Sequence, residues 1–192
     1  MRYTGALVSI LFVLGCGESH DLGDEDAGPD VGDLAACEVP SDCVVVPESC
    51  CGSCGAATRG DAIAVHRDRT GDWRGMACGD DMGCPACFMQ QDPTLVATCE
   101  AGHCAVVDLQ THPATECASA DDCRVRAAEC CECGATVEPG TLIAISDEGA
   151  FGPLVCDPGM GCPECLPMYP PEVSAACEAG RCVAVGPRDG EP

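Results

Sequence analysis

The sequence contains no lysine and no asparagine, and its positive charge comes from only nine arginines. These are scattered among 32 acidic residues, which gives a formal net charge of −23. Binding to the phosphates of nucleic acids needs clustered Lys or Arg side chains. The composition therefore excludes nucleic acid as a partner, and it also opposes direct adsorption to anionic lipid headgroups.

Large aromatic side chains are also scarce. Outside the N-terminal region the sequence has only Trp73, Phe88, Phe151 and Tyr169. Because aromatic residues bury the most apolar area, a chain with so few of them cannot build a large core, and covalent cross-links must help. The 21 cysteines exceed the share that marks a disulfide scaffold.

The first 16 residues have the order of parts found in an export signal. Arg2 is positively charged, residues 6–14 form an apolar run too short to span a bilayer, and a small residue precedes Cys16. The stretch Val13-Leu14-Gly15-Cys16 resembles the lipobox of bacterial lipoproteins. That resemblance implies removal of residues 1–15, attachment of lipid such as palmitate to Cys16, and a membrane as partner through this anchor. An ordinary secretory signal cleaved elsewhere is the alternative.

The cysteine count favours the lipobox interpretation. The total of 21 is odd, and a lipid on Cys16 leaves an even number to pair. Each buried methylene contributes about 0.8 kcal/mol, and a multiply acylated cysteine supplies the second chain that stable anchoring needs. Gly17 is not the Asp that retains some lipoproteins at the inner membrane, so the resemblance implies the outer membrane or the cell surface.

Residues 16–36 comprise the lipidated cysteine and an acidic segment rich in Gly, Asp and Glu. With little apolar content and like charges, this segment is expected to be a disordered, extended tether. A calcium loop is the alternative, because Asp24, Asp26 and Asp30 alternate. An EF-hand, however, needs a ligand and a glutamate where the chain has Gly28 and Ala35. We expect a solvated spacer and no bound metal.

The rest of the chain contains an internal duplication. Cysteine spacing in residues 37–108 is matched in residues 117–186, with a linker at 109–116 and a disordered tail at 187–192. Both copies contain a Met-Gly-Cys-Pro stretch, at residues 82–85 and 160–163. We expect two tandem homologous ten-cysteine domains that are small, disulfide-rich and mostly β, with short strands, hairpins and little helix. The cysteines expected to form structural disulfides are Cys37, Cys43, Cys50, Cys51, Cys54, Cys78, Cys84, Cys87, Cys99, Cys104, Cys117, Cys123, Cys130, Cys131, Cys133, Cys156, Cys162, Cys165, Cys177 and Cys182.

Local patterns predict short strands in each copy. Residues 44–46 form a β-branched run, and residues 63–65 form a second apolar run. The segments 95–99 and 104–107 flank a turn and predict a hairpin. A two-residue loop would place Cys99 opposite Cys104, close enough to bridge directly, whereas a three-residue loop with a bulge would offset them by one. Both cysteines could also bond other partners. The polar stretch that follows Val65, and its counterpart after Ile145, is predicted to be a loop.

Two pairs, Cys51-x2-Cys54 and Cys84-x2-Cys87, have the spacing of zinc knuckles. Export to an oxidising compartment and an even number of ten cysteines per copy favour disulfides instead. A thioredoxin-like role for Cys84-Pro-Ala-Cys87 lacks the helix N-terminus that lowers a thiol pKa. We therefore expect no cofactor. The adjacent cysteines 50–51 and 130–131 are expected to bond separate partners, because a vicinal bridge is strained.

Signals for catalysis are poor. The histidines do not recur between the copies: His66 aligns with Ser146, and His103 aligns with Arg181. No nucleophile, zinc-hydrolase, P-loop or dinucleotide motif is present. The tripeptide Arg59-Gly60-Asp61 has no counterpart in the second copy. The sequence therefore predicts a protein that is not an enzyme.

Three classes of function remain. We favour a non-enzymatic binding or structural module of the cell envelope, with a protein or glycan ligand. The alternatives are a protease inhibitor that presents loops at residues 66–77 and 146–155, and a metal-binding or thiol-redox lipoprotein. The repeats resemble cysteine-rich lipoproteins of GC-rich Gram-negative bacteria, myxobacteria especially, and this resemblance implies no particular activity.

Overall fold

The computed structural model describes residues 31–79, 83–85, 89–133, 141–165 and 167–186. Cys16, Cys87, the signal peptide, most of the tether and the tail lie outside the described residues. The end of the predicted tether is not disordered, because Leu34 is buried and the carbonyl of Ala35 accepts from the N–H of Cys104. The helices are α1 (Val31–Leu34), α2 (Thr70–Ala77) and α3 (Glu148–Val155). The strands are β1 (Cys43–Pro47), β2 (Gly55–Ala56), β3 (Ala62–His66), β4 (Met89–Gln90), β5 (Leu95–Glu100), β6 (His103–Asp108), β7 (Arg124–Ala127), β8 (Leu142–Ile145), β9 (Ser174–Glu178) and β10 (Arg181–Val185).

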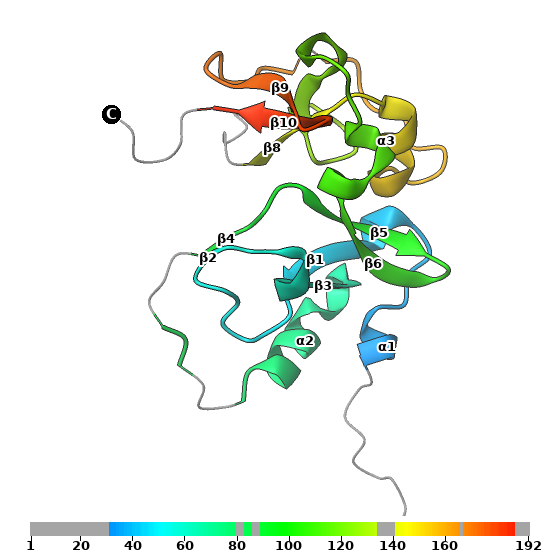
Figure 1. Ribbon diagram of the computed structural model, residues 1–192. Helices are drawn as coiled ribbons and strands as arrows, with labels where there is room; N and C mark the ends of the chain where they lie inside the picture. Colours follow the sequence, from blue (N-terminus) through cyan, green and yellow to red (C-terminus); the bar gives the residue numbers. More distant parts are fainter. Residues whose placement is uncertain (1–30, 80–82, 86–88, 134–140, 166, 187–192) are drawn as a thin grey trace, which may run out of the picture.

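The two repeats are built from the same parts in the same order. In the first repeat, β1 pairs with β3, α2 follows, and β5 and β6 form a hairpin; in the second, β7, β8, α3, β9 and β10 take the same places. Figure 1 shows the second repeat lying above the first. All described sheets have two strands, and all pairs except β2–β4 are antiparallel. The prediction of a small, mostly-β, disulfide-rich fold with short strands is confirmed.

The β-branched run of the first repeat forms β1, where Val44 lies opposite Val65 and Val46 lies opposite Ile63. Such residues fit a pleated, half-buried surface. In the second repeat all four residues of β8 are buried. In each repeat one strand of this ladder, β3 or β8, is mostly buried.

The predicted hairpins form in both repeats around a two-residue turn. Ala101 and Gly102 have φ values of 51° and 84°, which is the left-handed region that a tight type I′ turn requires at both positions. Cys99 therefore lies opposite Cys104 in the ladder. These two cysteines do not bond each other: Cys99 bonds Cys37 and Cys104 bonds Cys43.

The segments predicted to be loops are helical, and that prediction is wrong. Residues 67–77 form a 3-10 turn that continues into α2, and residues 148–155 form α3. Asp147 begins α3 by accepting hydrogen bonds from the backbone N–H groups of Gly149 and Ala150. Each helix ends at a disulfide-bonded cysteine, Cys78 or Cys156, so a cross-link holds a helix too short to be stable alone. The loops proposed for a protease inhibitor at 66–77 and 146–155 are therefore not extended loops.

The main apolar cluster is shared by the two repeats. Val96 of β5 and Leu109 are packed together with Ile143, Ile145 and Phe151 of the second repeat. A smaller cluster lies wholly within the first repeat, between the β1–β3 ladder and the hairpin. Burial of apolar area across the junction therefore stabilises the repeats against each other.

Residues 109–116, predicted as a linker, take part in this packing. They form two 3-10 turns, and Leu109, Ala114 and Thr115 are buried. A polar contact reinforces the junction, because Ser41 donates from its backbone N–H and its Oγ to the carboxylate of Asp157, at 2.9 Å and 2.7 Å. The segment between the repeats thus fixes them together.

Candidate functional site

The disulfides follow one pattern in both repeats. Nine disulfides connect described cysteines, and Cys54 is also disulfide-bonded. The adjacent cysteines bond separate partners, as predicted. Four bonds of each repeat match: Cys37–Cys99, Cys43–Cys104, Cys50–Cys78 and Cys51–Cys84 correspond to Cys117–Cys177, Cys123–Cys182, Cys130–Cys156 and Cys131–Cys162, and the second repeat adds Cys133–Cys165.

Each repeat has two places where two disulfides lie side by side, and at each place three sulfur atoms form a group. One group of three sulfur atoms, the inner triad, stands at the base of the hairpin, and it has one buried member in each repeat, Cys43 or Cys182. Its members are Cys37, Cys43 and Cys104 in the first repeat and Cys117, Cys123 and Cys182 in the second. The other group, the outer triad, is Cys50, Cys51 and Cys84, with Cys84 exposed; its three Sγ atoms lie within 4.8 Å of one another. In the second repeat the outer triad consists of Cys130, Cys131 and Cys162, with Cys162 exposed.

A buried arginine organises the second repeat. Arg126 on β7 is only 3% exposed, and its guanidinium lies 4.3 Å from the ring centroid of Phe151. Its Nη1 donates to Glu148 at 2.5 Å, and its Nη2 donates to the carbonyl of Glu129 at 2.7 Å. Burial lowers the pKa of Arg126, while the nearby carboxylate of Glu132 opposes that change. A buried charge with this many partners holds the chain around it in one arrangement.

The first repeat has no arginine at this place. Val46 stands where Arg126 does, and Trp73 stands where Phe151 does. The indole Nε1 of Trp73 donates to the carbonyl of Pro47 at 3.2 Å. In the second repeat, the corresponding carbonyl of Ala127 accepts from Arg126 Nε at 2.8 Å. Two different donors therefore satisfy the same backbone position.

This position also closes the strand edges. Pro47 has no N–H to offer a further strand, and the N–H of Ala127 donates to Tyr169 Oη at 3.3 Å. Tyr169 in turn donates to Glu132 at 2.8 Å. Unpaired edge groups invite another strand to add. The ends of β1 and β7 are thus protected against strand addition.

A groove of about 950 Å³ runs between the repeats. Its first wall contains β1 and Pro93, and its second wall contains residues 127–133 and Val155. Among the described lining residues, one base faces four acids: Arg67 against Asp61, Asp92, Glu129 and Glu132. Glu132 is paired with Arg124 at 3.2 Å. The remaining lining carboxylates still outnumber Arg67, so the groove has apolar walls and a net negative charge.

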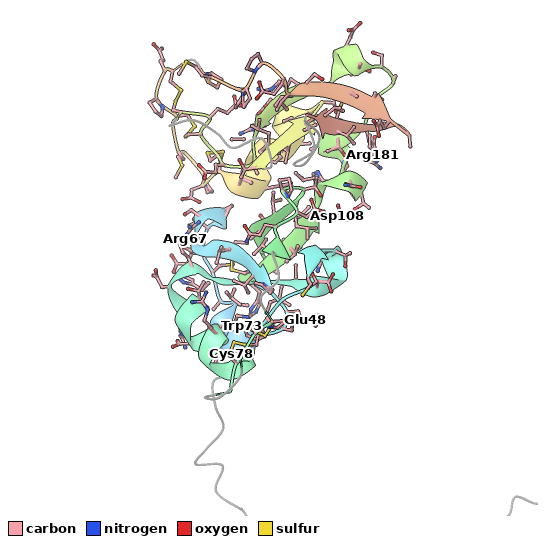
Figure 2. The ribbon with its side chains drawn as sticks, turned by 90° about the vertical axis from the view of Figure 1, so that its left-hand side faces the viewer. Glu48, Arg67, Trp73, Cys78, Asp108 and Arg181 are labelled. Atoms are coloured by element: carbon pink, nitrogen blue, oxygen red, sulfur yellow. A yellow bond between two sulfur atoms is a disulfide. The ribbon has the colours of Figure 1, made fainter. Side chains whose placement is uncertain are left out.

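A smaller hollow lies on the first repeat. It has a volume of about 370 Å³ and is lined by Glu48, Cys50, Cys51, Trp73 and Met76 among others. Figure 2 shows Glu48, Trp73 and Cys78 close together, at the end of the first repeat that faces away from the second. The outer triad of the first repeat thus borders this hollow. The outer triad of the second repeat borders the groove, because Cys130 and Cys131 line it.

Within the described residues, the structure places no histidine in a group of three or more potential metal ligands. His66 Nδ1 accepts from the N–H of Asp68, and His112 Nδ1 accepts from the N–H of Ala114, so both begin short helical turns. In the tripeptide at 59–61, Asp61 accepts from the N–H and the hydroxyl of Thr58. Each of these side chains serves its own segment of backbone.

Sequence reasoning missed the groove, because its two walls come from different repeats. It also missed the outer triads, whose members lie up to 34 residues apart along the chain. No helix in the described part of the chain has the length and apolar character needed to cross a membrane. Comparison with family models, with curated proteins and with solved structures finds no match to this chain.

Proposed function

We propose that this protein is a lipid-anchored, non-enzymatic binding module of the cell envelope, and that the groove between its repeats is the binding site. The observation that carries the proposal is the groove itself. Its volume of about 950 Å³ falls in the range of ligand sites. Because both repeats contribute walls and share one core, the groove is preformed and needs no rearrangement to receive a ligand.

The groove favours an extended, basic segment of another protein as its ligand. The valines of β1 and Val155 offer apolar contact, while the surplus of carboxylates attracts positive charge. Glu129 is exposed and lies on the groove wall, where it is free to pair with an arginine of the ligand. At the ends of β1 and β7, Pro47 has no N–H to donate and the N–H of Ala127 is taken by Tyr169, so contacts of the ligand at these two ends come from side chains.

The groove is tested by titrating the full-length protein, in detergent, with a fluorescein-labelled nonapeptide of alternating Arg and Val. Fluorescence anisotropy reports binding. Glu129→Arg should weaken binding roughly tenfold, since reversing one charge at a partly desolvated contact costs on the order of 1.4 kcal/mol. Glu100→Arg is the matched control, because Glu100 is equally exposed, lies at the hairpin tip and does not line the groove.

If both substitutions weaken binding equally, the peptide responds to net charge and the groove is not the site. If the peptide does not bind at all, the proposal of a basic peptide ligand is wrong. A glycan ligand would be indicated by binding of an uncharged oligosaccharide that Glu129→Arg leaves unchanged.

The anchor is tested separately through Cys16. Cells that express the full chain are fed labelled palmitate and then fractionated. The wild-type protein should carry label and remain with the membranes, whereas Cys16→Ser should lose the label and appear in the soluble envelope fraction. Retention of label by Cys16→Ser would contradict lipidation at this residue.

A further inference from the structure

We infer that the outer sulfur triad of each repeat is a site of thiol–disulfide exchange, whose substrate is a dithiol on a partner protein. This activity goes beyond ligand binding in the groove and does not depend on it. It rests on the placement of two disulfides beside each other at the surface of each repeat.

The first observation is the distance between the two bonds. Cys50 Sγ lies 3.9 Å from Cys84 Sγ, although these atoms belong to different disulfides, Cys50–Cys78 and Cys51–Cys84. In the second repeat Cys130 Sγ lies 3.9 Å from Cys162 Sγ. A sulfur released from one bond therefore stands next to the other bond without any movement of the backbone.

The second observation is access. Cys84 and Cys162 are exposed, and the other members of the outer triads are partly exposed. Each outer triad also borders a hollow: Cys50 and Cys51 line the hollow of the first repeat, and Cys130 and Cys131 line the groove. A thiolate on a partner protein thus has a route to Cys51 or Cys131. Access and the reach of the attacking sulfur govern the rate of exchange.

The inner triads provide the contrast within the same molecule. They have the same arrangement of sulfurs, but Cys43 and Cys182 are each only 5% exposed. They tie the hairpin to the start of its repeat. Each repeat therefore holds two sulfur triads of similar spacing, one with a buried member and one with an exposed member.

The reaction follows from the distances. A partner thiolate attacks Cys51 Sγ, forms a mixed disulfide and releases Cys84 as a thiolate. Cys84 then attacks Cys50 Sγ, which forms Cys50–Cys84 and releases Cys78 as a thiolate. The second thiol of the partner attacks the mixed disulfide and releases Cys51. The partner is oxidised from a dithiol to a disulfide, and the repeat is reduced by the same two electrons, with its thiols at Cys51 and Cys78.

After this relay the two free thiols, at Cys51 and Cys78, come from two different disulfides of the starting protein, and this can be measured. The full-length protein is treated with one equivalent of dithiothreitol, quenched with N-ethylmaleimide, and digested without further reduction for peptide mass spectrometry. We expect label at Cys51 and Cys78, and at Cys131 and Cys156, with new Cys50–Cys84 and Cys130–Cys162 cross-linked peptides. The inner triads should stay unlabelled.

The bond Cys133–Cys165 is the internal reference. Cys165 is exposed, but among the described residues this disulfide belongs to no such triad. Its reduction should label its own two cysteines in equal amounts. If the outer triads behave in the same way, with label at Cys51 and Cys84 and none at Cys78, reduction occurs without a relay and the inference is wrong. Equal labelling of inner and outer triads, or no labelling of the outer triads, also overturns it.

A double substitution tests the acceptor bond. Cys50→Ser combined with Cys78→Ser removes the bond Cys50–Cys78, which Cys84 attacks in the relay. In the first repeat, label should then move to Cys51 and Cys84. The second repeat is unchanged in this variant, and its label should remain at Cys131 and Cys156. That unchanged pattern shows that the second repeat is folded, and unlabelled Cys37, Cys43, Cys99 and Cys104 show that the hairpin of the first repeat is still tied in place. If Cys51 alone is labelled in the first repeat and Cys84 is found in another disulfide, then Cys84 does not need Cys50 as its acceptor, and the proposed relay is wrong.

Discussion

Phe151 connects the apolar core of the second repeat to the hairpin of the first, and Phe151→Ala tests that connection. The side chain is fully buried beside Val96 and Ile145, and Arg126 lies on its ring. Removing a buried phenylalanine costs about 3–5 kcal/mol. A desolvated cation–π contact of roughly 2 kcal/mol is lost with it. We expect a loss near the upper part of the first range, out of a typical total of about 5–15 kcal/mol.

The assay is guanidinium chloride unfolding with the disulfides intact, combined with hydrogen exchange of individual amides. The midpoint should fall by roughly 1–2 M, given a slope of about 3 kcal/mol/M. Because the cluster is shared, amides of β5 in the first repeat should lose protection together with those of β8 in the second. Trp73→Ala is the matched control, since Trp73 holds the equivalent place in the first repeat but lies outside the shared cluster.

The control substitution should leave the protection of β8 unchanged. The reasoning is refuted if Phe151→Ala exposes β8 while β5 keeps its full protection, because the repeats would then unfold as separate units. It is also refuted if the substitution costs less than about 1 kcal/mol, which would place Phe151 outside a well-packed core.

Three further outcomes follow from single positions. Ala101→Gly should stabilise the protein by up to about 1 kcal/mol in thermal unfolding, since Ala101 has φ of 51° and a left-handed alanine is strained, whereas Ala105→Gly within β6 should destabilise it. Burial raises the pKa of Tyr169, and its hydrogen bond to Glu132 adds to that effect. The contribution of Tyr169 to stability is therefore complete below about pH 10 and falls as pH rises through the higher folded pKa. Denaturant unfolding at alkaline pH should show that Tyr169→Phe removes this loss. Hydrogen bonds from the N–H groups of Ala118 and Ser119 lower the pKa of Asp122. Its contribution to stability is therefore present above about pH 4 and disappears as pH falls through the lower folded pKa. Asp122→Ala should lose this acid-dependent part of the stability, and an unchanged acid profile would contradict the assigned cause.

The hairpins could be predicted from the sequence because their signals are local. An Ala-Gly turn between β-prone segments predicts the hairpin, while its register was left open between a two-residue and a three-residue loop. The two-residue turn of the structure places Cys99 opposite Cys104. The separate partners of adjacent cysteines also followed from local chemistry. The choice of Cys37 and Cys43 as partners for the hairpin could not be predicted, because it depends on contacts about 60 residues apart in the sequence.

The two helices were missed for a different reason. Residues 67–77 contain glycines and charges that lower helix propensity, and an isolated segment of that length is not a stable helix in water. Tertiary packing and the bond at Cys78 decide the outcome. One signal was available, since Trp73 and Phe151 both stand five residues before a cysteine of the duplicated pattern. The groove left no signal, because its walls meet only after the repeats pack on their shared cluster.

The bonds Cys37–Cys99 and Cys117–Cys177 also determine how the protein responds to a pull along its chain. Tension entering at Cys37 passes directly to Cys99 and bypasses the residues between them, a separation of 62, and the second bond bypasses a separation of 60. The stretch that can lengthen between these two cross-links is residues 99–117, which fully extended spans roughly 60 Å. Under load, this stretch, which contains β6 and the segment between the repeats, would lengthen, while most of each repeat stays outside the path of force.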